Sequence, residues 1–270
     1  MGMKYEPIKD FLNKIFKKSF LRKIFYRMID ILLLRTWYIH KLMKDWIAQA
    51  PKQAKVLDAG SGLGQHSFFL ARKCKDCQII GVDIIKEQVD NNNLFFKKIG
   101  LGDRVKFVVA RLEDYVCEQC YDLILNIEVI EHIKDDRKVL ENFYKSLRSS
   151  GMLILSTPSL YGEHDHDHSE NSSFVDEHVR DGYDPEELAK MLEHIGFRDV
   201  NIKFMYGKFG RFAWKLTMKY PIIMLNKSFW FFLLLPFYYL LTMPIALLFN
   251  YLDTVVKNYQ GTSLLVIAKK

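Results

Sequence analysis

The stretch that decides the fold is Val56-Leu57-Asp58-Ala59-Gly60-Ser61-Gly62-Leu63-Gly64, an apolar segment that runs into a glycine-rich turn. Glycines let the backbone approach a ligand closely, and the helix expected over 64–73 offers free N–H groups at its start. The spacing is G-x-G-x-G, with Gln65 where a dinucleotide-binding turn has its third glycine. Asp58, two residues before the first glycine, would repel a pyrophosphate and suits an ammonium group.

Strands and helices alternate from this turn onward. Apolar runs predict further strands over 78–83, 105–110, 122–126, 152–156, 198–206 and 264–268, and helices are expected over 86–99, 135–148 and 184–196. Near-continuous apolar strands joined by helices indicate a parallel sheet covered on both faces. Asp83 ends the second strand, where a carboxylate can accept hydrogen bonds from both hydroxyls of a ribose.

Three segments stand out together: the turn quoted above, Gly-Val-Asp at 81–83, and Tyr-Asp-Leu-Ile-Leu-Asn-Ile-Glu-Val-Ile-Glu-His-Ile at 121–133. They resemble the class I S-adenosylmethionine-dependent methyltransferases, in the branch of the ubiquinone and menaquinone pathways. The resemblance covers roughly residues 55–206 and the last ten residues. It implies an α/β, Rossmann-like seven-stranded methyltransferase sheet, mostly parallel with an antiparallel last strand.

The same resemblance implies S-adenosyl-L-methionine as cofactor and assigns residues to it. Asp58 and the carbonyl of Asn126 would face its ammonium, Gly60, Gly62 and Gly64 its methionine part, Asp83 with Ile84 its ribose, and the backbone of Leu112 and Glu113 its adenine. The family often has an acid after the third strand, and Arg111 stands there in this sequence. The adenine contact is therefore left open.

The acceptor side is expected after the fourth strand, at Glu128, Glu131 and His132. Two carboxylates and an imidazole this close can hold a divalent cation or act as a base. The motif resembles a metal site of O-methyltransferases, but many relatives carry it beside the cofactor without metal, so both interpretations stay open. The candidates for general base are His132, Glu131 and His178, the last after a histidine-rich loop at 161–168.

Four cysteines form two C-x-x-C pairs, Cys74 with Cys77 and Cys117 with Cys120. Both pairs precede predicted strands at the edge of the sheet opposite the cofactor. A four-cysteine zinc site is one interpretation, although the spacing between the pairs exceeds that of zinc ribbons. Reduced thiols without a metal, as in a reducing cytosol, are the favoured interpretation.

The formal net charge of +7 is unevenly distributed. Residues 1–50 hold 11 basic and 4 acidic side chains, and residues 200–252 hold six basic side chains and no acid. The remaining body is acidic, which argues against nucleic acid as a partner. Residues 7–33 have apolar side chains at helical spacing, with Arg22 and other basic residues off the apolar stripe. This helix either binds a membrane surface or packs on the body as a cofactor lid.

A second apolar flank comprises 25 consecutive uncharged residues at 228–252. Its length suits a membrane span. However, the segment lies between two strands of one sheet, so both of its ends must lie on the same side of a membrane. We therefore expect a hairpin dipping into one leaflet, or interfacial helices, broken at Pro236 and Pro244. A buried cap or a homodimer interface is the alternative.

These features predict three parts: a basic helical extension or lid over 1–50, a methyltransferase domain over 51–206 plus 258–270, and an apolar helical insertion over 207–257. No secretory signal is expected. The expected enzyme is peripheral on the cytoplasmic face of the membrane and methylates a hydrophobic acceptor, such as a prenyl-quinone precursor or another lipid, preferably on oxygen. The alternatives are a soluble small molecule or sugar, an RNA 2′-hydroxyl, and a member without catalysis.

Overall fold

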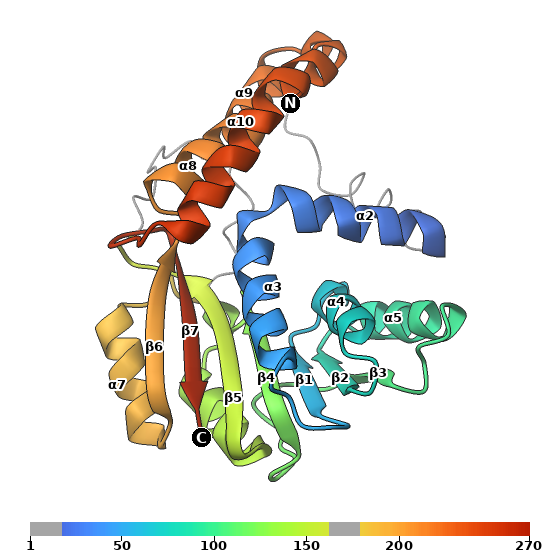
Figure 1. The fold of residues 1–270 in the computed structure, drawn as a ribbon, viewed down its shortest axis with the longest axis vertical. Coiled ribbons are helices and arrows are strands. Elements are labelled where there is room, and N and C mark those ends of the chain that lie inside the picture. Colours follow the sequence, from blue (N-terminus) through green and yellow to red (C-terminus); the bar gives the residue numbers. More distant parts are fainter. Residues whose placement is uncertain (1–17, 162–178) are drawn as a thin grey trace.

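A seven-stranded sheet forms the centre of the protein in the computed structural model, which describes residues 18–161 and 179–270 (Figure 1). Its strands are β1 (Lys55–Ala59), β2 (Gln78–Asp83), β3 (Val105–Val109), β4 (Tyr121–Ile127), β5 (Leu147–Pro158), β6 (Arg198–Met205) and β7 (Ser263–Lys269). The strand order is β3-β2-β1-β4-β5-β7-β6, and only β7 runs antiparallel to the strands beside it. The fold class predicted from the sequence is confirmed.

Helices cover both faces of the sheet. They are α3 (Leu34–Ile47), α4 (Gln65–Lys73) and α5 (Lys86–Lys98) on one face, and α6 (Asp136–Ser146) and α7 (Pro185–Ile195) on the other. Each face has its own apolar core, which explains why the central strands are apolar along nearly their whole length. The parallel strands end at one edge, and the glycine turn (residues 60–64) follows β1 there.

The N-terminal extension forms two helices where the sequence predicted one. Its described part begins with α2 (Ser19–Leu32), and the chain turns at Leu33 into α3. Arg22, expected on the outer side of an amphipathic helix, is instead 1% exposed and faces the body. That expectation was wrong because the partners of Arg22 are distant in the sequence, at Leu63 and Asn91.

The apolar insertion is a helical hairpin that projects beyond the carboxyl ends of the parallel strands (Figure 1). It consists of α8 (Lys208–Trp214), a π-helical turn η2 (Lys215–Lys219), α9 (Tyr220–Lys227), a 3-10 turn η3 (Phe229–Leu233) and α10 (Leu235–Val255). As expected from topology, both of its ends meet the sheet, at β6 and β7. By length and composition α10 is able to cross a membrane, and only 11% of its most apolar window is buried.

The two prolines of the insertion differ from each other: a helix boundary lies at Pro236, as expected, and none lies at Pro244. Pro236 lies in the first turn of α10, a position where its missing N–H costs little. Pro244 lies inside α10, and the helix continues through it. The expected break at Pro244 is therefore wrong, and the hairpin has one long return helix.

Both cysteine predictions are corrected by the structure. Cys74 is bonded to Cys77 and Cys117 to Cys120, with 5.5 Å between the Cα atoms of each pair. Two intervening residues bring the Cα atoms within disulfide reach. The pairs are therefore neither reduced thiols nor one shared zinc site.

Candidate cofactor and acceptor site

The glycine turn is tied to the second strand. The backbone N–H groups of Gly60 and Ser61 both donate to the carbonyl of Val82, at 2.8 and 2.9 Å. Gly60 has φ +79°, and a Cβ there would overlap the side chain of Val129. Gly62 also has positive φ, but a Cβ on it would meet only Gln88, at 4.0 Å. The turn is therefore tightly packed at Gly60 and open at Gly62, as a ligand cradle requires.

Asp83 stands beside this opening, at the end of β2. One of its carboxylate oxygens accepts from the N–H of Gly62 at 2.8 Å, and the other accepts from the N–H of Ile85 at 2.9 Å. Each oxygen retains a lone pair, so the carboxylate is fixed in place and still able to accept ribose hydroxyls. Ile84 is exposed beside it.

Asp58 is buried beneath the turn and caps α4. Its Oδ2 accepts from the hydroxyl of Ser67 at 2.6 Å and from the Ser67 N–H at 3.1 Å. Burial raises the pKa of Asp58 to about 7, against the hydrogen bonds from Ser67, which lower it. A cationic ligand group nearby would favour the charged form of this carboxyl.

Asn126 joins β4 to β1, since its side-chain amide donates to the carbonyl of Ala59 at 3.1 Å. Its Oδ1 is buried and accepts no hydrogen bond within the described part of the chain. A buried acceptor without a partner is costly, so a donor such as a ligand ammonium fits there. This orphaned oxygen and the open backbone at Gly62 show that these residues fit S-adenosylmethionine.

The predicted adenine segment is held by a residue that the sequence did not single out. The side-chain amide of Asn142, on α6, donates to the carbonyls of Leu112 and Glu113 at 3.0 and 2.9 Å. Arg111 forms an ion pair with Glu113 at 2.6 Å. The basic residue at the position of the family's usual acid is thus neutralised within the segment itself.

On the acceptor side, Glu128 binds an arginine from the N-terminal extension. The Nη1 atom of Arg35, on α3, lies 2.8 Å from Glu128 Oε2, and the hydroxyl of Ser156 donates to Glu128 Oε1 at 2.5 Å. Arg35 also donates its backbone N–H to the hydroxyl of Tyr206 at 3.3 Å. Glu128 and Tyr206 both have positive φ, an uncommon conformation that often marks functional positions. Sequence periodicity gave no signal for Arg35.

Glu131 is buried next to this group and accepts a hydrogen bond from the hydroxyl of Thr157 at 3.1 Å. Its Oε1 is buried without a partner among the residues described. Burial, with a smaller contribution from the charge of Glu128, raises the pKa of Glu131 to about 7. His132 is exposed. His178 lies outside the described residues, so its predicted role as a base stays a prediction.

The three predicted metal ligands, Glu128, Glu131 and His132, do not converge. Within the described ranges, the one group of three side chains whose ligand atoms lie within 4.8 Å of one another is Cys74, Asp76 and Cys77. That group precedes β2, at the opposite edge of the sheet, and its sulfurs form a disulfide. The guanidinium of Arg35 stands where a cation would meet Glu128.

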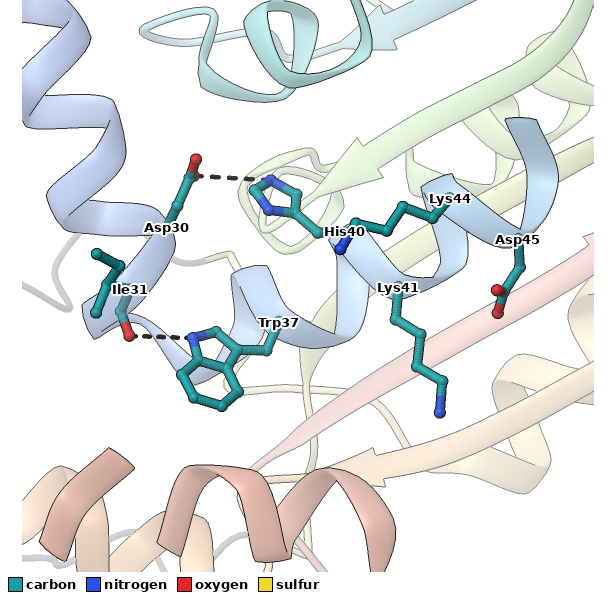
Figure 2. Close-up of a pocket in the computed structure, with 7 residues that line it drawn as sticks. All are labelled: Asp30, Ile31, Trp37, His40, Lys41, Lys44 and Asp45. Atoms are coloured by element: carbon teal, nitrogen blue, oxygen red, sulfur yellow. Dashed lines mark hydrogen bonds and ion pairs between the residues drawn. The ribbon is translucent and has the colours of Figure 1, made fainter. Parts of the chain in front are cut away.

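A half-open groove of about 390 Å³ lies where α2 meets α3, lined by Asp30, Ile31, Trp37, His40, Lys41, Lys44 and Asp45 (Figure 2). The indole N–H of Trp37 donates to the carbonyl of Ile31 at 3.0 Å, and His40 lies 3.7 Å from Asp30. No predicted site residue lines the groove. Its contacts join the two helices of the extension.

Residues 51–196 match the family described as methyltransferase domain, which is more than half of the chain. The chain belongs to this family. The geometry agrees, because every predicted cofactor residue lies in β1, β2, β4 or the segments that follow the carboxyl ends of the strands.

The relatives of this methyltransferase act on varied acceptors. The present chain is 30% identical to phosphoethanolamine N-methyltransferase 1 of Triticum aestivum, over 54% of this chain and 28% of that protein. It is 26% identical to a ubiquinone biosynthesis O-methyltransferase of Rickettsia prowazekii, over 38% of this chain and 39% of that protein. A tRNA methyltransferase of Escherichia coli is also a relative, at 31% identity over 42% of this chain and 43% of that protein. The chain thus spans less than half the length of these proteins.

Solved structures agree on the fold. Phosphoethanolamine N-methyltransferase 2 of Haemonchus contortus, in complex with S-adenosyl-L-methionine, superposes with a TM-score of 0.60 and 17% identity, over 87% of this chain and 52% of that one.

Proposed function

We propose that this methyltransferase transfers a methyl group from S-adenosylmethionine to a hydrophobic acceptor at the surface of an anionic membrane. The observation that carries the proposal is the apolar hairpin. It lies at the same edge of the sheet as the cofactor turn, and most of its large apolar side chains are exposed.

The donor side of the reaction rests on the glycine turn. S-adenosylmethionine supplies an electrophilic methyl group on a sulfonium. Gly62 leaves space where the methionine part would lie, Asn126 Oδ1 would accept from the ammonium, and Asp83 would accept from the ribose hydroxyls. These contacts orient the donor toward the acceptor, and proximity and orientation supply most of the rate enhancement.

On the acceptor side, Glu131 is the group suited to take a proton. Its carboxyl is buried, its Oε1 meets no donor among the described residues, and its pKa of about 7 suits a base at neutral pH. A base at this place favours an acceptor hydroxyl, hence O-methylation. Arg35 forms an ion pair with the neighbouring Glu128, which fixes the position of that side chain.

The membrane part of the proposal rests on the surface of the hairpin. Exposed apolar side chains recur along α9, η3 and α10 and at the residue between the last two: Ile222, Ile223, Trp230, Phe232, Leu233, Leu234, Phe237, Leu240, Leu241, Ile245, Leu248 and Tyr251. Large apolar side chains gathered on an exposed surface are typical of an interaction site. Residues 200–252 contain six basic side chains and no acid, which favours anionic headgroups.

Vesicle flotation tests this proposal. The full chain should float with vesicles containing phosphatidylglycerol, and Leu240→Glu with Leu241→Glu should reduce binding at least about tenfold, because charge at an apolar membrane contact is expensive. Both leucines are exposed, so the variant should keep its melting temperature.

The matched control is Leu94→Glu, the same substitution at an exposed leucine on α5, which should float like the wild type. A wild-type protein that does not bind vesicles and forms a stable dimer through the hairpin would favour the alternative, an enzyme for a soluble acceptor.

A further inference from the structure

The inner face of α2 is hydrogen-bonded to the cofactor turn and to the start of α4 through Arg22, Tyr26 and Asp30, which are spaced four residues apart. Arg22 donates from Nη2 to the carbonyl of Leu63 at 2.6 Å, and the hydroxyl of Tyr26 donates to the same carbonyl. Asp30 accepts from the side-chain amide of Gln65, the first residue of α4, at 2.8 Å. Residues four apart share one helix face, so this face of α2 lies on the turn along two full helical turns.

Arg22 makes several of the contacts between α2 and the body of the protein. Its guanidinium lies 4.3 Å from the centre of the Phe95 ring and also donates to Asn92 Oδ1. Asn92 in turn donates its Nδ2 to the carbonyl of Gly62 at 2.9 Å. The contacts of α2 therefore reach Gly62, the open position of the cofactor cradle.

The outer face of α2 carries the opposite chemistry. Five large apolar side chains are exposed there: Phe20, Leu21, Ile24, Met28 and Ile31. With 3.6 residues per turn, they lie on the side of the helix opposite Arg22, Tyr26 and Asp30. Phe20 is 73% exposed and Arg22 is 1% exposed. This is the reverse of a surface helix of a soluble protein, which faces its apolar side inward.

The charged side chains beside the outer face of α2 indicate what kind of surface it binds. Lys23 and Arg27 are exposed on α2, and its one acid, Asp30, is bound by Gln65. An apolar stripe beside basic side chains fits an anionic lipid surface. The basic, apolar hairpin lies at the same edge of the molecule as α2 (Figure 1).

We propose that the outer face of α2 binds an anionic phospholipid surface and that this binding is coupled to cofactor binding, because the inner face of the same helix holds the glycine turn. The inference rests on the proposed function. Lipid contact favours the docked position of α2, and the docked position fixes the backbone of residues 62–65. Coupling between two sites is reciprocal, so each ligand must strengthen the other by the same factor.

Isothermal titration calorimetry of the full chain with S-adenosylhomocysteine tests the coupling. Saturating phosphatidylglycerol vesicles should lower its Kd at least about fivefold, and phosphatidylcholine vesicles should not. Reciprocally, S-adenosylhomocysteine should strengthen vesicle binding by the same factor. Equal Kd values with and without bound anionic vesicles would overturn the coupling.

Variants assign the effect to α2. Ile24→Glu with Met28→Glu should bind S-adenosylhomocysteine like the wild type without vesicles and should lose the strengthening by vesicles. Val116→Glu, at an exposed position before β4, is the matched control and should keep it. Persistent strengthening in the α2 variant would overturn the assignment. Failure of the wild type to bind S-adenosylhomocysteine at all would instead refute the proposed function.

Discussion

Gly60 joins two constraints at one residue: a left-handed backbone and contact with Val129. Gly100 has nearly the same φ, +75°, but a Cβ added there would meet no atom within 4 Å. We expect Gly100→Ala to lower the free energy of unfolding by about 1–2 kcal/mol, the cost of the left-handed conformation. Gly60→Ala should lose a further 1–3 kcal/mol or so from overpacking.

Guanidinium denaturation measures both losses. Adding Val129→Ala to Gly60→Ala removes the two Cγ atoms that a Cβ at position 60 would overlap, although the Cβ of residue 129 remains at 2.9 Å. The double variant should therefore recover most of the loss that is due to overlap and keep the backbone part. Equal losses for the two glycine variants would contradict the packing described for the turn.

At the scale of residues, the sequence located the candidate cofactor residues but not the side-chain contacts between distant segments. The motif located Asp83 and Asn126 at the carboxyl edge of the sheet, and their side chains lie there in hydrogen bonds that suit a ligand. The sequence placed Arg22 on the wrong side of its helix and did not single out Arg35. Each of these arginines contacts residues on other elements, and Leu63, a partner of Arg22, is 41 residues away in the sequence. Helical periodicity carries no information about such contacts.

At the scale of elements, two histidines pack at the interface of α3 and α4: His40 is buried and His66 is half-buried. His40 stacks on Phe69 with ring centres 3.6 Å apart and packs edge-on to His66. Burial lowers the pKa of His40 to about 4, and burial with the charges nearby lowers the pKa of His66 to about 3. His40 is therefore neutral near pH 7, and its contact with Asp30 is not an ion pair.

Because of His40 and His66, the free energy of unfolding depends on pH in the acidic range. Between pH 6.5 and 4 the unfolded chain binds protons that the native histidines do not, so their contribution to stability falls as the pH falls. His40→Gln with His66→Gln removes this contribution. Relative to wild type, the variant should gain at least about 2 kcal/mol on going from about pH 7 to about pH 4.5.

The readout is the difference between variant and wild type at each pH, measured by urea denaturation. The raised pKa values of Asp58 and Glu131 give a pH dependence of opposite sign, which cancels in that difference. His194→Gln, an exposed residue near the end of α7, is the control. A constant difference across this pH range would contradict the burial described.

The elements themselves were largely predictable. Strand β2 lies where the apolar run indicated, and α7 begins after Asp184, whose side chain caps it, and ends at Gly196. The end of α2 at Leu32 agrees with the apolar periodicity over 7–33. Two expectations differ from the structure. Pro244 lies inside a continuous α10, where a break was expected. Strand β5 begins at Leu147, five residues earlier than predicted.

At the scale of the whole molecule, the two basic apolar flanks meet at one edge. The sequence located the positive charge in residues 1–50 and 200–252 but did not relate these stretches in space. In the structure, Tyr38 on α3 donates to Asp253 at the end of α10, at 2.9 Å to Oδ2, which joins the root of the hairpin to the extension. The cofactor turn lies at this same edge.

The most direct test of the central claim is transfer of labelled methyl groups. The full chain is incubated with S-adenosylmethionine labelled at the methyl group, together with vesicles made from a total lipid extract, and the labelled product is identified by mass spectrometry. The account predicts that label enters a lipid-soluble product, bound through oxygen, and that Leu240→Glu with Leu241→Glu reduces its formation. Label found only in a water-soluble acceptor or in RNA would contradict it.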